Sequence, residues 1–115
     1  MGNRGDKVKK SELEQLCNSG GGILIKTSGR ISISNPPLGF EKIKSLIGLS
    51  QKDLVEVITL RSLDLVILCD EEGRLKGESF NPIATSIMGF EFPHAMLRNE
   101  FLVGDVFICG TDTLD

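Results

Sequence analysis

The feature that most constrains the fold is an unbroken apolar run at residues 65–69 (LVILC), which ends in the acidic turn DEEG at residues 70–73. A strand without polar alternation is typical of a position that is buried on both faces of a sheet. A second mostly apolar run, residues 54–60 (LVEVITL), ends only four residues before the first. The two runs therefore predict an antiparallel hairpin at the centre of a sheet.

Two further stretches extend this sheet. Residues 23–27 and 30–34 flank a Ser-Gly pair, and the second of them alternates isoleucine with serine, which is typical of a hairpin with one exposed face. Residues 101–103 and 106–109 are short apolar runs on either side of a Gly-Asp pair. They predict a last strand that bends or turns back at that pair.

Helical signals appear along the chain between these runs. Ser11 begins a capping-box pattern, and apolar residues from Phe40 to Ile47 recur at helical spacing. Asn81 is followed by proline, which combines a good cap with a residue that suits the first helical position. We therefore expect an α+β fold, with a mainly antiparallel sheet of about five strands and two or three short helices packed on one face.

The chain of 115 residues suits one domain that buries a core without disulfide bonds. We predict a flexible arm at residues 1–10 and a single α+β domain at residues 11–115. The three cysteines, Cys17, Cys69 and Cys109, are far apart, as in cytosolic proteins with reduced thiols. No stretch approaches the ~20 apolar residues of a membrane span, and no secretory signal is present, so we expect a cytoplasmic protein.

Charge is distributed unevenly along the chain. Residues 1–57 carry 9 basic and 6 acidic residues, and residues 58–115 carry 4 basic and 10 acidic, which gives +3 and −6 and a net charge of −3. This asymmetry is too small for a polybasic groove. The chain also lacks tyrosine and tryptophan, which argues against a stacking platform for single strands. Nucleic acid is therefore not expected as a partner.

Asp70, Glu71 and Glu72 form the densest group of carboxylates, with Glu78 close in sequence. Grouped carboxylates at the end of a strand are typical ligands of Mg²⁺ or Ca²⁺. The spacing of a calcium-binding loop is absent, so an ordinary solvated turn is favoured. A small metal-dependent hydrolase or nucleotide-processing enzyme that uses these three carboxylates is the alternative function.

No catalytic residues and no cofactor are predicted. His94 is the only histidine, whereas zinc sites need several histidine or cysteine ligands at short spacings. A cysteine nucleophile needs an accessible thiolate, and Cys69 and Cys109 both lie in apolar runs. The sequence therefore favours a protein that is not an enzyme, without deciding the question.

The polar residues between the acidic turn and the helix start form a candidate ligand-binding site, which comprises Arg74, Lys76, Ser79, Asn81 and Thr85. The two basic side chains could meet a phosphate, while the N–H groups and the dipole of a helix start favour an anion. A small anionic, nucleotide-like ligand is one hypothesis. The other is that Asn81 only caps the helix and that the basic side chains are solvated.

Three blocks, residues 69–77, Asn81-Pro82 with Ala84, and residues 104–110, together resemble a family known as domain of unknown function 3846. That family occurs in bacteria, their mobile elements and their phages. The resemblance covers residues from about 40 to 110 and departs in residues 90–100. It implies a fold and a genomic setting, and it carries no catalytic residues.

We expect a non-enzymatic accessory protein of a phage or mobile element, in the cytoplasm of a bacterial host. It would bind and block or sequester a host factor, which is either a host protein or a nucleotide-type signal in counter-defence. Residues 90–100 have no clear period but contain four apolar side chains: Phe90, Phe92, Met96 and Leu97. Exposing them together would leave an apolar patch, so we also expect a homo-oligomer.

Overall fold

The computed structural model describes residues 20–35, 38–94 and 100–111. The helices and strands follow one another as β1 (Gly22–Ile25), β2 (Ile31–Ser34), α2 (Phe40–Leu46), β3 (Val55–Leu60), the 3-10 turn η2 (Arg61–Leu63), β4 (Leu65–Asp70), α3 (Pro82–Met88) and β5 (Val106–Gly110). The predicted arm and the helix predicted from Ser11 lie outside the described residues. Within those residues, no helix is long and apolar enough to cross a membrane.

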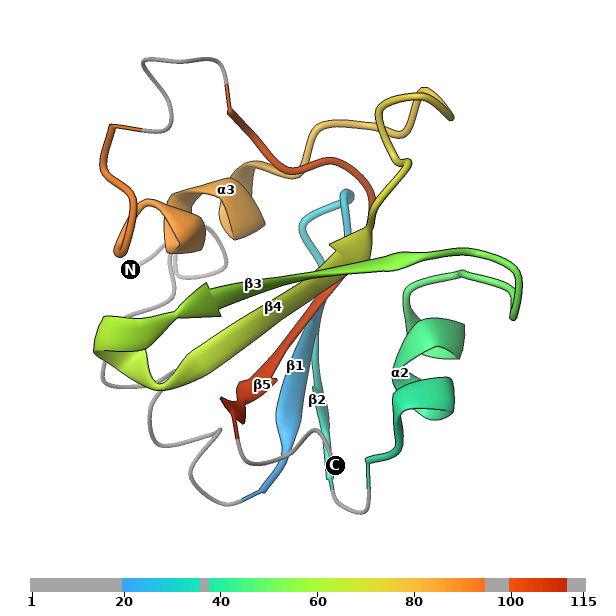
Figure 1. Cartoon of the computed structure of the whole chain (residues 1–115), viewed down its shortest axis with the longest axis horizontal. Helices are drawn as coiled ribbons and strands as arrows, with labels where there is room; N and C mark the ends of the chain where they lie inside the picture. Colours follow the sequence, from blue (N-terminus) through green and yellow to red (C-terminus); the bar gives the residue numbers. More distant parts are fainter. Residues whose placement is uncertain (1–19, 36–37, 95–99, 112–115) are drawn as a thin grey trace.

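The five strands form one antiparallel sheet in the order β2-β1-β5-β4-β3, which confirms the α+β fold (Figure 1). Both predicted hairpins are present, β1 with β2 and β3 with β4. The prediction that the second hairpin lies at the centre is wrong, because β5 is the central strand and β3 is at an edge. Glu56 and Thr59 of β3 are exposed, as suits an edge strand, whereas β5 is buried from Val106 to Cys109.

The helices cover opposite faces of the sheet, and not one face as predicted (Figure 1). On one face, Ile67 and Ile108 belong to an apolar cluster that contains Ile87 of α3. On the other face, Phe107 belongs to a second cluster that contains Ile43 of α2. Successive residues of a strand point to opposite faces, so strands that are apolar throughout need a cover on both.

Only the second half of the predicted last strand joins the sheet. Residues 101–103 run beside the approach to α3 instead, where Val103 forms an isolated antiparallel bridge with Phe80. Gly104 follows with a φ of +79°, a conformation that glycine adopts readily, and the chain then enters β5. Residues 101–103 therefore form a wall beside the sheet.

Candidate functional site

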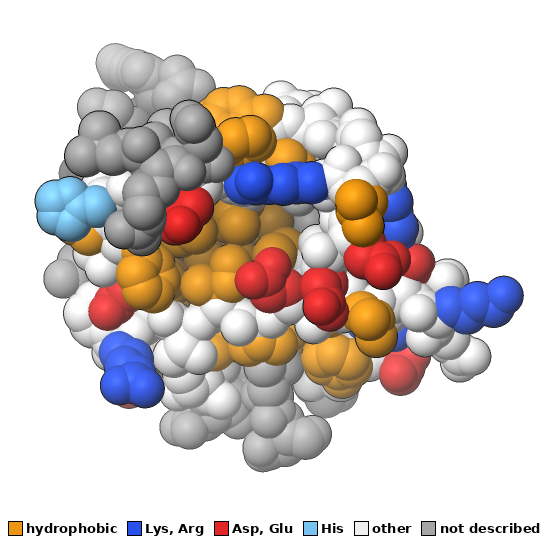
Figure 2. Space-filling model, turned by 45° about the horizontal axis from the view of Figure 1, so that its top comes forward, with side chains coloured by type: hydrophobic (Ala, Val, Ile, Leu, Met, Phe, Trp, Pro, Cys, Tyr) orange, Lys and Arg blue, Asp and Glu red, His pale blue; other side chains and the backbone are white. Residues whose placement is uncertain are grey.

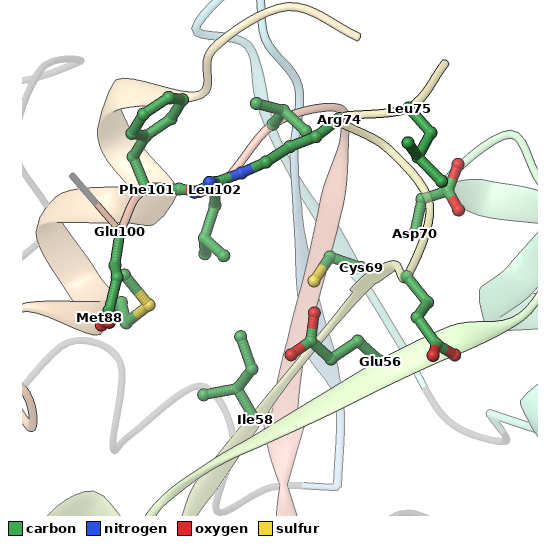
Figure 3. Close-up of a pocket in the computed structure, with 12 residues that line it drawn as sticks. Glu56, Ile58, Cys69, Asp70, Arg74, Leu75, Met88, Glu100, Phe101 and Leu102 are labelled. Atoms are coloured by element: carbon green, nitrogen blue, oxygen red, sulfur yellow. The ribbon is translucent and has the colours of Figure 1, made fainter. Parts of the chain in front are cut away.

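A cavity of about 330 Å³ lies between the end of β4 and this wall, and we call it the β4 pocket. Figure 2 shows an apolar hollow with acidic and basic side chains around it, and Figure 3 shows its lining. The apolar part of the lining comes from β3, β4, α3 and the wall, and comprises Ile58, Cys69, Met88, Phe101, Leu102 and Val103. Glu56, Asp70, Glu71, Arg74, Leu75 and Glu100 complete the lining.

Arg74 connects the turn after β4 to the wall. Its Nη2 donates a hydrogen bond of 2.6 Å to the carbonyl oxygen of Phe101, and its Cζ lies 4.3 Å from the centre of the Phe101 ring. Phe80 packs edge-on against the same ring, with 5.5 Å between ring centres. Stacking of a guanidinium on an aromatic face is favourable and fixes its plane. Arg74 therefore helps to hold residues 101–103 in place beside the pocket.

Lys76 is an ion-pair partner of two carboxylates. Its Nζ lies 2.8 Å from Asp53 Oδ1 and 2.9 Å from Asp70 Oδ2. These contacts, the one with Asp53 first, hold the pKa of Lys76 above its ordinary value. The hydrogen bond from Lys76, followed by those from Ser50, lowers the pKa of Asp53 to about 2. The positive charge of Lys76 is therefore offset within the protein.

Asp70 and Glu78 form a hydrogen-bonded pair of carboxyl groups beside this ion pair. Burial, and then the bond and charge of Asp70, raise the pKa of Glu78 to about 7. Burial alone would raise the pKa of Asp70, but contacts with Lys76, Glu78 and the N–H of Glu72 outweigh it and lower that pKa. Asp70 Oδ2 accepts no well-formed hydrogen bond from the described residues, so the ion pair with Lys76 compensates its burial.

Asn81 and Thr85 hold the wall against α3 and the sheet. Asn81 is completely buried, and its Nδ2 donates to the carbonyl oxygens of Ile25 at 3.0 Å and Gly104 at 2.8 Å. Its Oδ1 accepts from the N–H of Ala84, which confirms the predicted cap. The Oγ1 of Thr85 accepts from the N–H of Leu102 at 2.9 Å. Both side chains therefore have structural partners.

The five residues predicted to bind a ligand do not line one cavity. Arg74 lines the β4 pocket, whereas Lys76 faces Asp53 and Asp70, and Ser79 is exposed. The anionic-ligand hypothesis lets Arg74 and Lys76 meet one phosphate, and in the structure these two side chains have different contacts. The structure thus favours the other hypothesis for Asn81, a helix cap.

The three carboxylates of the acidic turn also differ in burial. Asp70 is buried against Lys76, while Glu71 and Glu72 are exposed. Among the described residues, no group of three or more histidine, cysteine, aspartate or glutamate side chains is placed to hold a metal ion. The acidic turn therefore places one carboxylate in an internal ion pair and two at the surface.

Cys69 is a nucleophilic residue of the lining, and its sulfur lies in the β4 pocket beside Glu56 (Figure 3). Burial, followed by the negative charges of Glu56, Asp70 and Glu78, raises the pKa of this thiol to about 12. A protonated thiol is a poor nucleophile. The pocket thus offers no activated nucleophile at Cys69.

Sequence reasoning missed the apolar part of the β4 pocket. Ile58, Met88 and Leu102 come from three distant parts of the chain, and each fits an ordinary core pattern. The available signal was the run at residues 101–103, which precedes a Gly-Asp pair and is too short to be a convincing strand. Only its position beside Arg74 makes it a pocket wall.

Comparison with known proteins gives one family. The model of a family described as Domain of unknown function (DUF3846) matches residues 22–115. No curated protein and no solved structure matches the chain significantly. The match begins at β1, earlier than the resemblance at about residue 40 indicates, and it therefore includes all five strands and the β4 pocket.

Proposed function

The chain belongs to the DUF3846 family, and from the geometry of its site we propose that it is a non-enzymatic accessory protein that binds a host protein through the β4 pocket. The observation that carries this proposal is a pocket with an apolar inner part in which two reactive groups, Asp70 and Cys69, are not available for chemistry. Asp70 is paired with Lys76, and the Cys69 thiol is held protonated. Such a pocket suits recognition better than chemistry.

A protein partner is favoured over a nucleotide by the charges around the pocket. Among the described residues, its lining includes the acidic side chains of Glu56, Glu71 and Glu100 and one cation, the guanidinium of Arg74. Lys76, the other cation predicted to meet a phosphate, is offset by Asp53 and Asp70. A phosphate in the pocket would thus meet more negative than positive charge. An apolar side chain of a protein would instead bury surface against Met88 and Leu102.

The genomic setting of the proposal is the one that the family resemblance implies. A small protein of a phage or mobile element can act in a bacterial cytoplasm by occupying a surface of a host protein, which requires only affinity and no catalysis. The large exposed side chain of Leu75, at 87% exposure, borders the pocket and would extend such a contact.

Affinity capture from a bacterial lysate tests this proposal. Immobilised wild-type protein should retain a host protein that mass spectrometry identifies, and Leu75→Ser or Glu71→Lys should lower its recovery about tenfold, because the first removes an apolar contact and the second reverses a charge at the border of the pocket. Both changes are at exposed positions and leave the core intact. Lys42→Glu, on α2 and the opposite face, is the matched control and should retain the partner. Recovery that is the same for all four proteins would refute a role of the β4 pocket.

A further inference from the structure

The β4 pocket has two chemically distinct parts. Its inner part is apolar, with Met88 and Leu102 almost fully buried beneath it and Ile58 half-buried. A closed cavity of roughly 150 Å³ already holds a benzene ring, so a pocket of about 330 Å³ has room for the side chain of a leucine or methionine. The inner part therefore fits an apolar side chain.

The outer part is acidic. Glu56 and Glu71 are exposed, and both line the pocket, from β3 and from the turn after β4. Figure 3 shows the carboxylate of Glu56 directed into the pocket beside Cys69. Among the described residues that line the pocket, Arg74 is the only cation, and it is stacked on Phe101. Any group that sits just outside the apolar part thus meets an excess of negative charge.

We propose that the β4 pocket docks a segment of a partner protein in which an apolar side chain is flanked by lysine or arginine. This proposal rests on the proposed function and specifies the chemistry of the partner. The apolar side chain contacts Ile58, Met88 and Leu102, and the flanking cations pair with Glu56 and Glu71. Complementary charge at the edge of an interface steers encounter and rejects wrong partners. A segment with acidic flanks would be repelled.

Matched tripeptides, acetylated and amidated so that only the side chains carry charge, test this chemistry. The probes are Lys-Leu-Lys, Glu-Leu-Glu and Lys-Ala-Lys, with isopentylammonium as a small-molecule comparison. Binding is measured from the NMR shifts of the Ile58 and Met88 methyl groups of the full chain. Lys-Leu-Lys should bind about fivefold more tightly than either other peptide, since two exposed charge pairs and one buried side chain each contribute on this scale.

Charge variants identify the source of the preference. Glu56→Gln with Glu71→Gln should reduce the preference for Lys-Leu-Lys over Glu-Leu-Glu to about twofold or less, and added salt should weaken it in the wild type. Glu41→Gln, at the exposed start of α2, is the control and should leave the preference unchanged.

Three outcomes would overturn this inference. Equal or tighter binding of Glu-Leu-Glu would exclude a cationic partner. Binding of isopentylammonium as tight as that of Lys-Leu-Lys would assign the pocket to small amines and not to a protein segment. If no peptide shifts the methyl groups while capture of a host protein still depends on Leu75, the proposed function stands and the cationic segment is wrong.

Discussion

Glu78 is exposed to water only in part, and its carboxyl group lies among other charged groups. Its carboxyl group lies against Gly73 and Gly104, and a Cβ at either glycine would meet Glu78 Oε1. It is hydrogen-bonded to Asp70, and Lys76 and Asp105 are the other charges that act on it. Burial disfavours the charged form of Glu78, and two carboxyl groups in contact share a proton more readily than they both ionise, so the pKa of Glu78 rises to about 7. Against the effect of burial, the hydrogen bond from Lys76, followed by the contact with Glu78, lowers the pKa of Asp70.

The sign of the resulting pH dependence follows from linkage. The pKa of Glu78 rises from 4.5 to about 7 on folding, so its contribution to stability is full below about pH 4.5 and is lost as the pH rises through about 7. The pKa of Asp70 falls below 3.8, so its contribution is present above pH 3.8 and is lost as the pH falls through the lower, folded-state value. The pair is therefore most favourable in mildly acidic solution.

Glu78→Gln isolates this effect, because glutamine keeps the shape and donates a hydrogen bond to Asp70 at every pH. We expect the variant to be more stable than the wild type by about 1 kcal/mol at pH 8.5 and to differ little at pH 5, after allowance for solvent screening. Urea unfolding at both pH values measures this difference. Glu72→Gln, at an exposed position on the same turn, is the control. A difference between Glu78→Gln and wild type that is the same at both pH values would contradict the shared proton.

At the scale of elements, the contact between β1 and β5 leaves no space for a side chain at residue 22. Gly22 is paired with Cys109, and a Cβ built on it would collide with the ring of Phe107 and lie 2.9 Å from the carbonyl oxygen of Ile108. The ring fills the space above β1, on the face that α2 covers. The close packing of β1 against β5 therefore requires glycine at position 22.

Gly22→Ala should lower the free energy of unfolding by about 2 kcal/mol, because overpacking forces the Phe107 ring or the backbone to move. Chemical denaturation measures the loss. Gly39→Ala, where nothing lies within 4 Å of the added Cβ, is the control and should change stability by about 0.5 kcal/mol or less. Phe107→Leu should partly relieve the strain, so the double variant should be more stable than the sum of the two single losses predicts. Strict additivity would show that Phe107 is not the obstacle.

At the scale of the whole molecule, the sheet is covered on both faces, yet some large apolar side chains are exposed on the surface of the protein. Phe90 and Phe92, which follow α3, are 43% and 39% exposed. They belong to the segment at residues 90–100 that predicts a homo-oligomer, whereas Met96 and Leu97 lie outside the described residues. Self-association remains a prediction, and its surface would be this segment.

Light scattering on the purified protein tests self-association. We expect a dimer or larger species at high concentration, and we expect Phe90→Ser with Phe92→Ser to shift it toward monomer, because burying such side chains supplies most of the association energy. Phe40→Ser removes an equally exposed phenylalanine, at 43%, from the start of α2 and should leave the assembly unchanged. A wild type that stays monomeric at high concentration would exclude the homo-oligomer.

The sequence by itself determined the local elements, because their signals are local. Apolar runs and turn residues predicted the β1–β2 and β3–β4 hairpins, and Asn81 with its proline predicted the start of α3, all of which the structure confirms. The acidic turn after β4 was also evident from composition alone. These signals from neighbouring residues did not indicate which other strand or helix each element packs against.

Only the tertiary structure decided how those elements were used. It placed β5 at the centre, covered both faces of the sheet, and tied Lys76 to Asp53 and Asn81 to Ile25, residues 23 and 56 positions apart in sequence. Lys76 and Asn81, both predicted to bind a ligand, have these partners within the protein, and the lining of the β4 pocket also comes from distant parts of the chain. The physical reason is that burial, ion pairing and pocket shape depend on residues that folding brings together, which no pattern of neighbouring residues reports.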